Sequence, residues 1–197
     1  MQLCFVAILG LLFGSFLNVV VYRIPFNLSI VYPRSQCKVC GKPIVWFDLL
    51  PVLSWIILRG KCRYCRSFIG LRYPLIEILT SFLFVIGFIK LSIPFDFVSL
   101  ISSFIFICFL ICISFIDIDH LIIPDKILIP FWISGLLIHS FSFYQGLFNI
   151  VLLDNLIKKI FGSLFVYLIF LLIVSAGKFC YKKPFLGMGD VKLFAVL

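Results

Sequence analysis

The chain has 197 residues, of which 63% are hydrophobic, and its mean hydropathy is +1.25. A soluble globular domain is closer to half apolar, so this composition excludes an ordinary soluble fold and predicts an all-α protein that crosses a lipid bilayer several times. The formal net charge is +9, with 17 Lys and Arg against 8 Asp and Glu, so every acidic residue is informative.

The first apolar segment, Leu3 to Val21, is about as long as a membrane-spanning helix. It lacks a basic region before it and a small-residue cleavage site after it, which favours a retained helix over a signal peptide. Residues 22–73 follow and carry nine Lys and Arg, opposed by Asp48 alone. Nucleic acid could bind such a segment, but the neighbouring spans favour a cytoplasmic loop that obeys the positive-inside rule. We therefore expect no nucleic-acid partner.

Four cysteines in this polar segment form two C-x2-C pairs, Cys37 with Cys40 and Cys62 with Cys65. Each pair places two thiols on one tight turn, and two such turns complete a closed tetrahedral zinc site. Disulfides are disfavoured in a reducing cytoplasm, and a redox C-x2-C normally stands alone, although both uses and a metal-free remnant stay open. We expect a small zinc-knuckle domain with one structural zinc ion.

Further apolar segments are predicted at about 74–93, 97–116, 127–143 and 160–176, and a sixth begins near Gly187 and stops at Leu197. The fold class is thus a polytopic membrane protein with about five full transmembrane helices and the start of a sixth. If the basic loop is cytoplasmic, the N-terminus is periplasmic. The segments 117–125 and 178–190 then share the cytoplasmic face of the membrane.

Two aspartates, Asp117 and Asp190, lie at predicted membrane boundaries, where a carboxylate costs free energy unless it is paired, wet or neutralised. Asp117 directly follows an apolar span, and Asp190 closes the turn Gly187-Met188-Gly189-Asp190. Taken singly, each is also compatible with a helix end or an N-cap. Taken together, two nearby carboxyls share one proton, which suits aspartic proteolysis.

The remaining acids have less specific interpretations. Asp119 and His120 are expected to be solvated neighbours of Asp117, in a loop after the span, and Asp125 is expected to cap the next helix. Glu77 lies within a predicted span, so it is either a functional group or the partner of Arg72 or another basic residue.

The sequence resembles the bacterial type IV prepilin peptidases, which are bifunctional leader peptidases and N-methyltransferases. The resemblance covers almost the whole chain. It is carried by Gly14 through Pro25, by the two C-x2-C pairs, by Arg72-Tyr73-Pro74-Leu75-Ile76-Glu77, and by the motifs around Asp117 and Asp190.

This resemblance implies that Asp117 and Asp190 are the catalytic pair, with Asp117 preferred over Asp119 because of its spacing before Ile123-Pro124-Asp125. It implies a prepilin or pseudopilin substrate of a type IV pilus or type II secretion system, cleaved at the cytoplasmic face of the inner membrane. S-adenosylmethionine would supply the methyl group for the new N-terminus. The chain has no glycine-rich nucleotide fingerprint, so no residues are assigned to that cofactor.

The apolar and polar segments divide the chain into a first helix (1–21), a zinc domain (22–73) and a transmembrane peptidase domain (74–197). Family members continue past the Gly-x-Gly-Asp motif, whereas this chain stops seven residues after Asp190, so we expect the peptidase domain to be truncated at its C-terminus. An inactive remnant or a non-catalytic membrane scaffold is the alternative. An ion-coupled transporter would place its acids near the bilayer midplane, not at helix ends.

Overall fold

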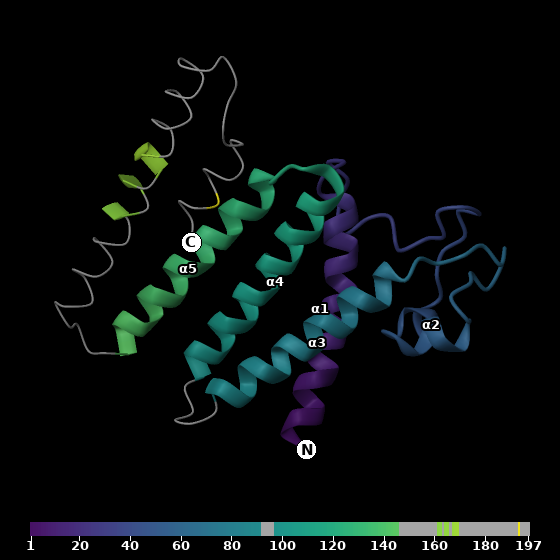
Figure 1. Ribbon diagram of the computed structural model, residues 1–197, viewed down its shortest axis with the longest axis horizontal. Helices are drawn as coiled ribbons and strands as arrows, with labels where there is room; N and C mark the ends of the chain where they lie inside the picture. Colours follow the sequence, from purple (N-terminus) through teal and green to yellow (C-terminus); the bar gives the residue numbers. More distant parts are fainter. Residues whose placement is uncertain (92–96, 146–160, 163, 166, 170–192, 194–197) are drawn as a thin grey trace, which may run out of the picture. The chain divides into compact units, whose positions relative to one another are not determined.

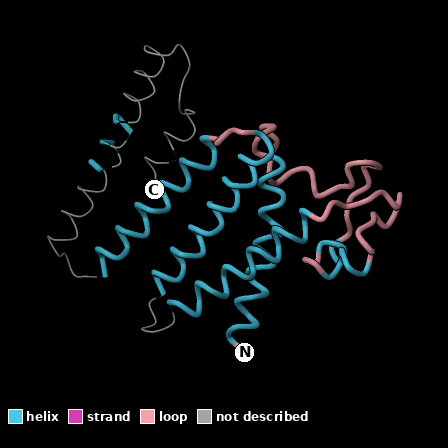
Figure 2. The backbone as a smooth tube through the Cα atoms, viewed as in Figure 1, coloured by secondary structure: helices cyan, strands magenta, loops and turns pink. Residues whose placement is uncertain are grey.

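The computed structural model describes residues 1–91, 97–145, 161, 162, 164, 165, 167–169 and 193. Its elements are helical: α1 (Gln2–Arg23), the 3-10 turn η1 (Trp46–Leu49), α2 (Leu53–Ile57), α3 (Arg72–Leu91), α4 (Phe97–His120) and α5 (Asp125–Gln145) (Figures 1 and 2). The part of the chain that is described contains two isolated bridges and no strand. The predicted helical class is therefore confirmed.

Three of the described helices, α1, α3 and α4, are long and apolar enough to cross a membrane. The 22 residues of α1 correspond to about 33 Å at 1.5 Å per residue, which matches a hydrocarbon core of about 30 Å. The helix expected at 127–143 is present as α5. The span expected at 160–176 and the segment after Gly187 lie largely outside the described residues.

The chain divides into two compact units, residues 1–120 and 121–197. In the first unit, α1 packs mainly against α3, and α4 packs against both. The cysteine module, which we define as residues 24–71, connects α1 to α3 at one end of these helices (Figure 1). The stacked rings of Phe84 and Phe104, with centroids 4.2 Å apart, join α3 to α4.

Two glycines on α1 allow its backbone to approach α3 closely. A Cβ atom added to Gly10 would lie 2.5 Å from the Cα of Ser81, and one added to Gly14 would lie 2.6 Å from the Cα of Glu77. Glycines four residues apart are a known means of close helix packing in membranes. Gly10 and Gly14 therefore determine how near α3 can lie to α1.

Side-chain hydrogen bonds reinforce this antiparallel pair at both ends. The Ser81 hydroxyl donates to the carbonyl of Ala7 at 2.8 Å. The amide of Asn18 donates to the carbonyls of Gly14 at 3.2 Å and Tyr73 at 3.1 Å. Polar groups in a membrane need such internal partners because lipid offers none. The start of α3, and with it the end of the cysteine module, is thereby held beside α1.

The close approach leads to a first prediction. We expect Gly14→Ala to destabilise the protein by about 1–3 kcal/mol, because the added methyl group forces α1 and α3 apart. Gly135→Ala, in α5, is the matched control, since a Cβ there meets no atom of the described residues within 4 Å. It should change stability by no more than about 1 kcal/mol. Unfolding in detergent, followed by circular dichroism, measures both, and equal effects would contradict this account.

Candidate functional site

The two C-x2-C segments fold into the same local structure, although only their cysteines match in sequence. The N–H of Cys37 donates to the carbonyl of Lys42 at 2.9 Å, and the N–H of Cys62 donates to the carbonyl of Ser67 at 2.8 Å. Isolated antiparallel bridges flank both turns, Gln36 with Pro43 and Lys61 with Phe68. Each position of the first turn thus has a counterpart 25 residues later (37 to 62, 40 to 65).

Each turn is closed by a residue with a positive φ directly after the second cysteine. Gly41 has φ +69° and Arg66 has φ +60°. Their N–H groups donate to the carbonyls of Cys37 at 2.9 Å and Cys62 at 3.0 Å. Glycine adopts this conformation without steric cost, whereas arginine does not, so the second turn is retained despite local strain. Strain of this kind persists where the surrounding structure requires the turn.

The two turns bring all four thiols together. The Sγ atoms of Cys37, Cys40, Cys62 and Cys65 lie within 4.8 Å of one another. Cys37 and Cys65 are 3.7 Å apart, and the Ser67 hydroxyl lies 3.0 Å from the sulfur of Cys65. Cys62 is buried, whereas Cys65 is exposed. Such a cluster can hold a metal ion, as the spacing predicts.

The module also makes some of these thiols acidic. The backbone N–H groups of Cys40 and Val39 lower the pKa of Cys37 to about 6. The hydroxyl of Ser67, with its N–H, lowers the pKa of Cys65. The N–H of Lys42 acts in the same direction on Cys40, but burial and the neighbouring thiols outweigh it and raise that pKa to about 11. Metal ligation requires thiolates, and the lowered pKa of Cys37 favours its thiolate.

Asp117 lies on the last turn of α4 rather than in a loop after it. The sequence predicts that this helix ends at Ile116, but its backbone continues to His120. Leu121 then adopts φ +53°, the left-handed conformation that ends many helices. The Asp117 carboxyl is half-buried and forms no hydrogen bond or ion pair within the described part of the chain. Its position is therefore set by the last turn of α4.

Asp119 has a charged partner, contrary to the expectation that it is a solvated neighbour of Asp117. Its carboxylate forms an ion pair with Arg72, the first residue of α3. Arg72 also donates to the carbonyl of Phe115 at 3.3 Å, and its guanidinium lies 5.5 Å from the centroid of the Phe115 ring. One arginine thus ties the start of α3 to the end of α4 on either side of Asp117. The neighbouring His120 packs edge-on against Phe26 at 5.3 Å.

Glu77 has a different partner from those considered in the sequence. Its side chain is buried and accepts the N–H of Val52 at 2.7 Å, whereas Arg72 pairs with Asp119. Val52 has φ +59°, which is strained for a β-branched residue. Glu77 therefore connects the membrane helices to the cysteine module and stabilises a strained corner before α2. Asp190 lies outside the described residues, so its approach to Asp117 stays a prediction.

The Arg72–Asp119 pair can be tested by a double-mutant cycle. We expect Arg72→Gln and Asp119→Asn to show a coupling of about 0.5–1 kcal/mol, since the two side chains are 39% and 28% exposed. Arg72→Gln and Asp117→Asn should be additive, because no hydrogen bond or ion pair joins these two described side chains. Unfolding in detergent measures the change in the free energy of unfolding for each single and double variant. Additivity in the first pair, or equal coupling in both pairs, would contradict the assignment.

Comparison with known proteins connects both sites to one family. The model of the bacterial peptidase A24 N-terminal domain matches residues 8–91, and that of the type IV leader peptidase family matches residues 104–197. The first match contains most of α1, the cysteine module and α3, and the second contains Asp117 and Asp190. No solved structure matches the chain.

Similar proteins in three organisms carry the name prepilin leader peptidase/N-methyltransferase. The one from Myxococcus xanthus is 35% identical over 98% of this chain, which spans 54% of that relative's length. Those from Neisseria gonorrhoeae and Bacillus subtilis are each 34% identical over 97% and 96% of the chain, which spans 71% and 70% of their lengths. On these matches, the chain belongs to the type IV leader peptidase family.

Proposed function

We propose that this protein is a membrane aspartic endopeptidase that removes the leader of prepilins or pseudopilins and methylates the new N-terminus. The observation that carries the proposal is the position of Asp117. Its carboxyl is held by the last turn of α4, in a region that matches the type IV leader peptidase family. Relatives named prepilin leader peptidase/N-methyltransferase support both activities and the prepilin substrate.

In the proposed reaction, Asp117 and Asp190 share one proton. The charged carboxylate takes a proton from a water molecule, which attacks the scissile carbonyl, while the protonated carboxyl donates to the carbonyl oxygen. Collapse of the tetrahedral intermediate breaks the C–N bond, and a proton passes to the leaving amine. The products are a leader with a new carboxylate and a mature protein with a free N-terminus.

The structure favours Asp117 over Asp119 for this role. The Asp119 carboxylate forms an ion pair with the Arg72 guanidinium, and one of its oxygens is engaged in that contact. Asp117 has no such partner within the described residues, so it is able to exchange a proton with water or with a second carboxyl. The family spacing before Ile123-Pro124-Asp125 favours the same residue.

We further propose that the four-cysteine cluster binds one structural zinc ion. Tetrahedral zinc with Zn–S bonds of about 2.3 Å requires sulfur–sulfur distances of about 3.8 Å. The separation of 3.7 Å between Cys37 and Cys65 supports this ligand geometry, and the other pairs lie within 4.8 Å. A bound metal would join two turns that otherwise share little apolar core. Residues 22–73 would then form a zinc domain between the first helix and the peptidase domain, 74–197.

The remaining assignments concern the membrane. We propose five full spans and the start of a sixth, in the bacterial inner membrane, with the N-terminus periplasmic and the catalytic face cytoplasmic. The nine Lys and Arg of residues 22–73 support this orientation through the positive-inside rule. S-adenosylmethionine would supply the methyl group, for which no residues of this chain are assigned.

The proposal is tested by co-expressing the chain with a prepilin in cells that lack their own leader peptidase. Mass spectrometry of the pilin is expected to detect loss of the leader and a gain of one methyl group at the new N-terminus. A pilin that keeps its leader although this protein is present in the membrane would contradict the peptidase assignment. Cleavage without methylation would contradict the second activity alone.

A further inference from the structure

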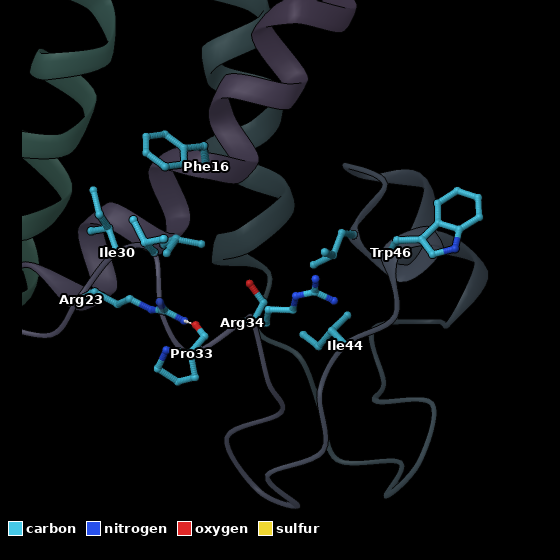
Figure 3. A pocket seen from close by; sticks show the side chains of 11 residues that line it. Phe16, Arg23, Ile30, Pro33, Arg34, Ile44 and Trp46 are labelled. Carbon is cyan, nitrogen blue, oxygen red and sulfur yellow. Dashed lines mark hydrogen bonds between the residues drawn. The ribbon is translucent and has the colours of Figure 1, made fainter.

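A pocket of about 450 Å³ lies beside the end of α1 that enters the cysteine module (Figure 3). Phe16, Val19 and Ile44 are among its apolar lining residues, and Arg23, Arg34 and Ser35 are its polar ones. A volume of this size suits a small molecule or a lipid headgroup. None of its lining residues belongs to the thiol cluster or to the carboxylates discussed above, so those sites do not account for it.

The described residues that line the pocket include two arginines and no acid. Arg23 is held in place because its guanidinium donates to the carbonyls of Ser29 at 2.8 Å and Pro33 at 2.7 Å. Asp48 is the one acid of the cysteine module, and both of its oxygens accept bonds from Arg63, at 2.6 and 2.7 Å. No carboxylate of the module therefore neutralises the two arginines of the pocket.

Arg34 is the group available to a ligand. It forms no hydrogen bond or ion pair with any residue in the described ranges. Figure 3 shows its guanidinium amid the lining residues, close to Ile44, whereas the Arg23 guanidinium is bonded to Pro33. A guanidinium presents a planar set of donors that binds phosphate oxygens in pairs. An anionic phosphate is thus the chemistry that complements Arg34.

The pocket also has an apolar part, which lies along α1. Arg23 ends the helix, and at 1.5 Å per residue Val19 and Phe16 lie about 6 and 10 Å further into the span. Phe16 is half exposed, so its ring faces the surroundings of the helix. In a bilayer these two residues lie at the depth of the acyl chains, while Arg23 lies at the depth of the headgroups.

We propose that this pocket binds an anionic glycerophospholipid. The phosphate lies on the Arg34 guanidinium, and an acyl chain lies along Phe16 and Val19. Basic pockets at the membrane boundary bind such headgroups because the charge is matched and the chain stays in hydrocarbon. A free phosphate ion would use Arg34 but would leave the apolar part of the pocket unfilled, so the lipid accounts for both halves.

The test uses the full chain in nanodiscs that contain phosphatidylglycerol and phosphatidylcholine. After transfer to detergent, native mass spectrometry counts the lipids that stay bound. The wild-type protein is expected to retain phosphatidylglycerol in preference to phosphatidylcholine, and Arg34→Gln to bind it about tenfold more weakly. Arg59→Gln is the matched control, because it removes the same charge. Arg59 is exposed and lies outside the pocket.

Each outcome of this test decides the proposal. Equal retention by the wild type and Arg34→Gln would overturn it, and so would an equal loss in Arg59→Gln, which would indicate a general charge effect. Retention of the lipid by Phe16→Ala at the wild-type level would overturn the acyl-chain contact and assign a simple phosphate site. Phe16→Ala separates the same two cases, since it should weaken lipid retention and leave phosphate binding unchanged. Circular dichroism checks that each variant keeps its helices.

Discussion

Asp117→Asn is expected to lower the rate of leader cleavage by about 10³-fold or more, with little change in the amount of folded protein. An amide of the same shape cannot take a proton from water, and proton transfer by a positioned group contributes about 10²–10⁴-fold to such reactions. The carboxyl is half-buried and forms no hydrogen bond or ion pair among the described residues, so the change to an amide of the same shape breaks no such bond there. The measurement is the conversion of a prepilin in membranes that contain matched amounts of enzyme.

The control is Asp119→Asn, which makes the same chemical change two residues further along α4. It breaks the ion pair with Arg72 and should reduce stability slightly while leaving most of the cleavage activity. Asp190→Asn is expected to match Asp117→Asn, and the double variant should lose no more than either single one, since two carboxyls that share a proton act as a unit. A similar loss in Asp117→Asn and Asp119→Asn would refute the assignment of the catalytic carboxyl.

Sequence patterns predicted those parts of the structure that depend on residues close together in the chain. The apolar runs gave α1, α3 and α4 to within a few residues, because a membrane requires a minimum helix length. The spacing of Cys37, Cys40, Cys62 and Cys65 predicted a cluster, since each C-x2-C pair forms its turn by itself. The two tight turns were predicted, but the sequence does not show the bridges that flank them or the positive φ of Arg66.

The predictions were wrong where contacts between residues distant in sequence determine the local structure. The run from Asp117 to His120 is polar enough to suggest a loop, yet α4 continues through it, with Arg72 bonded to its last turns. That partner is distant in sequence, and the register of α3 against α4 is set by packing that no local pattern encodes. Gly10 and Gly14, by contrast, are four residues apart in an apolar helix, a spacing that indicates close helix packing from the sequence itself.

Replacing Cys37 or Cys62 with serine is expected to remove about one equivalent of bound zinc per chain and to unfold the cysteine module. The proposed zinc ion would join the two turns, and a structural site of this kind contributes much of the folding free energy of its domain. Trp55 provides a local probe, because its indole N–H donates to the carbonyl of Ile69 at 3.0 Å and its ring packs against Gly60. Loss of the second turn should therefore change tryptophan fluorescence and expose the module to proteases.

Cys4→Ser is the matched control, since Cys4 is an exposed residue of α1 outside the cluster, and it should retain both the metal and the fold. Metal analysis of the purified, reduced proteins measures the zinc content. The membrane helices should persist in the cluster variants, because α1 and α3 are joined by contacts at Gly10, Gly14 and Ser81 that do not involve the thiols. Absence of zinc from the intact protein, or its retention in the serine variants of the cluster, would refute the metal site.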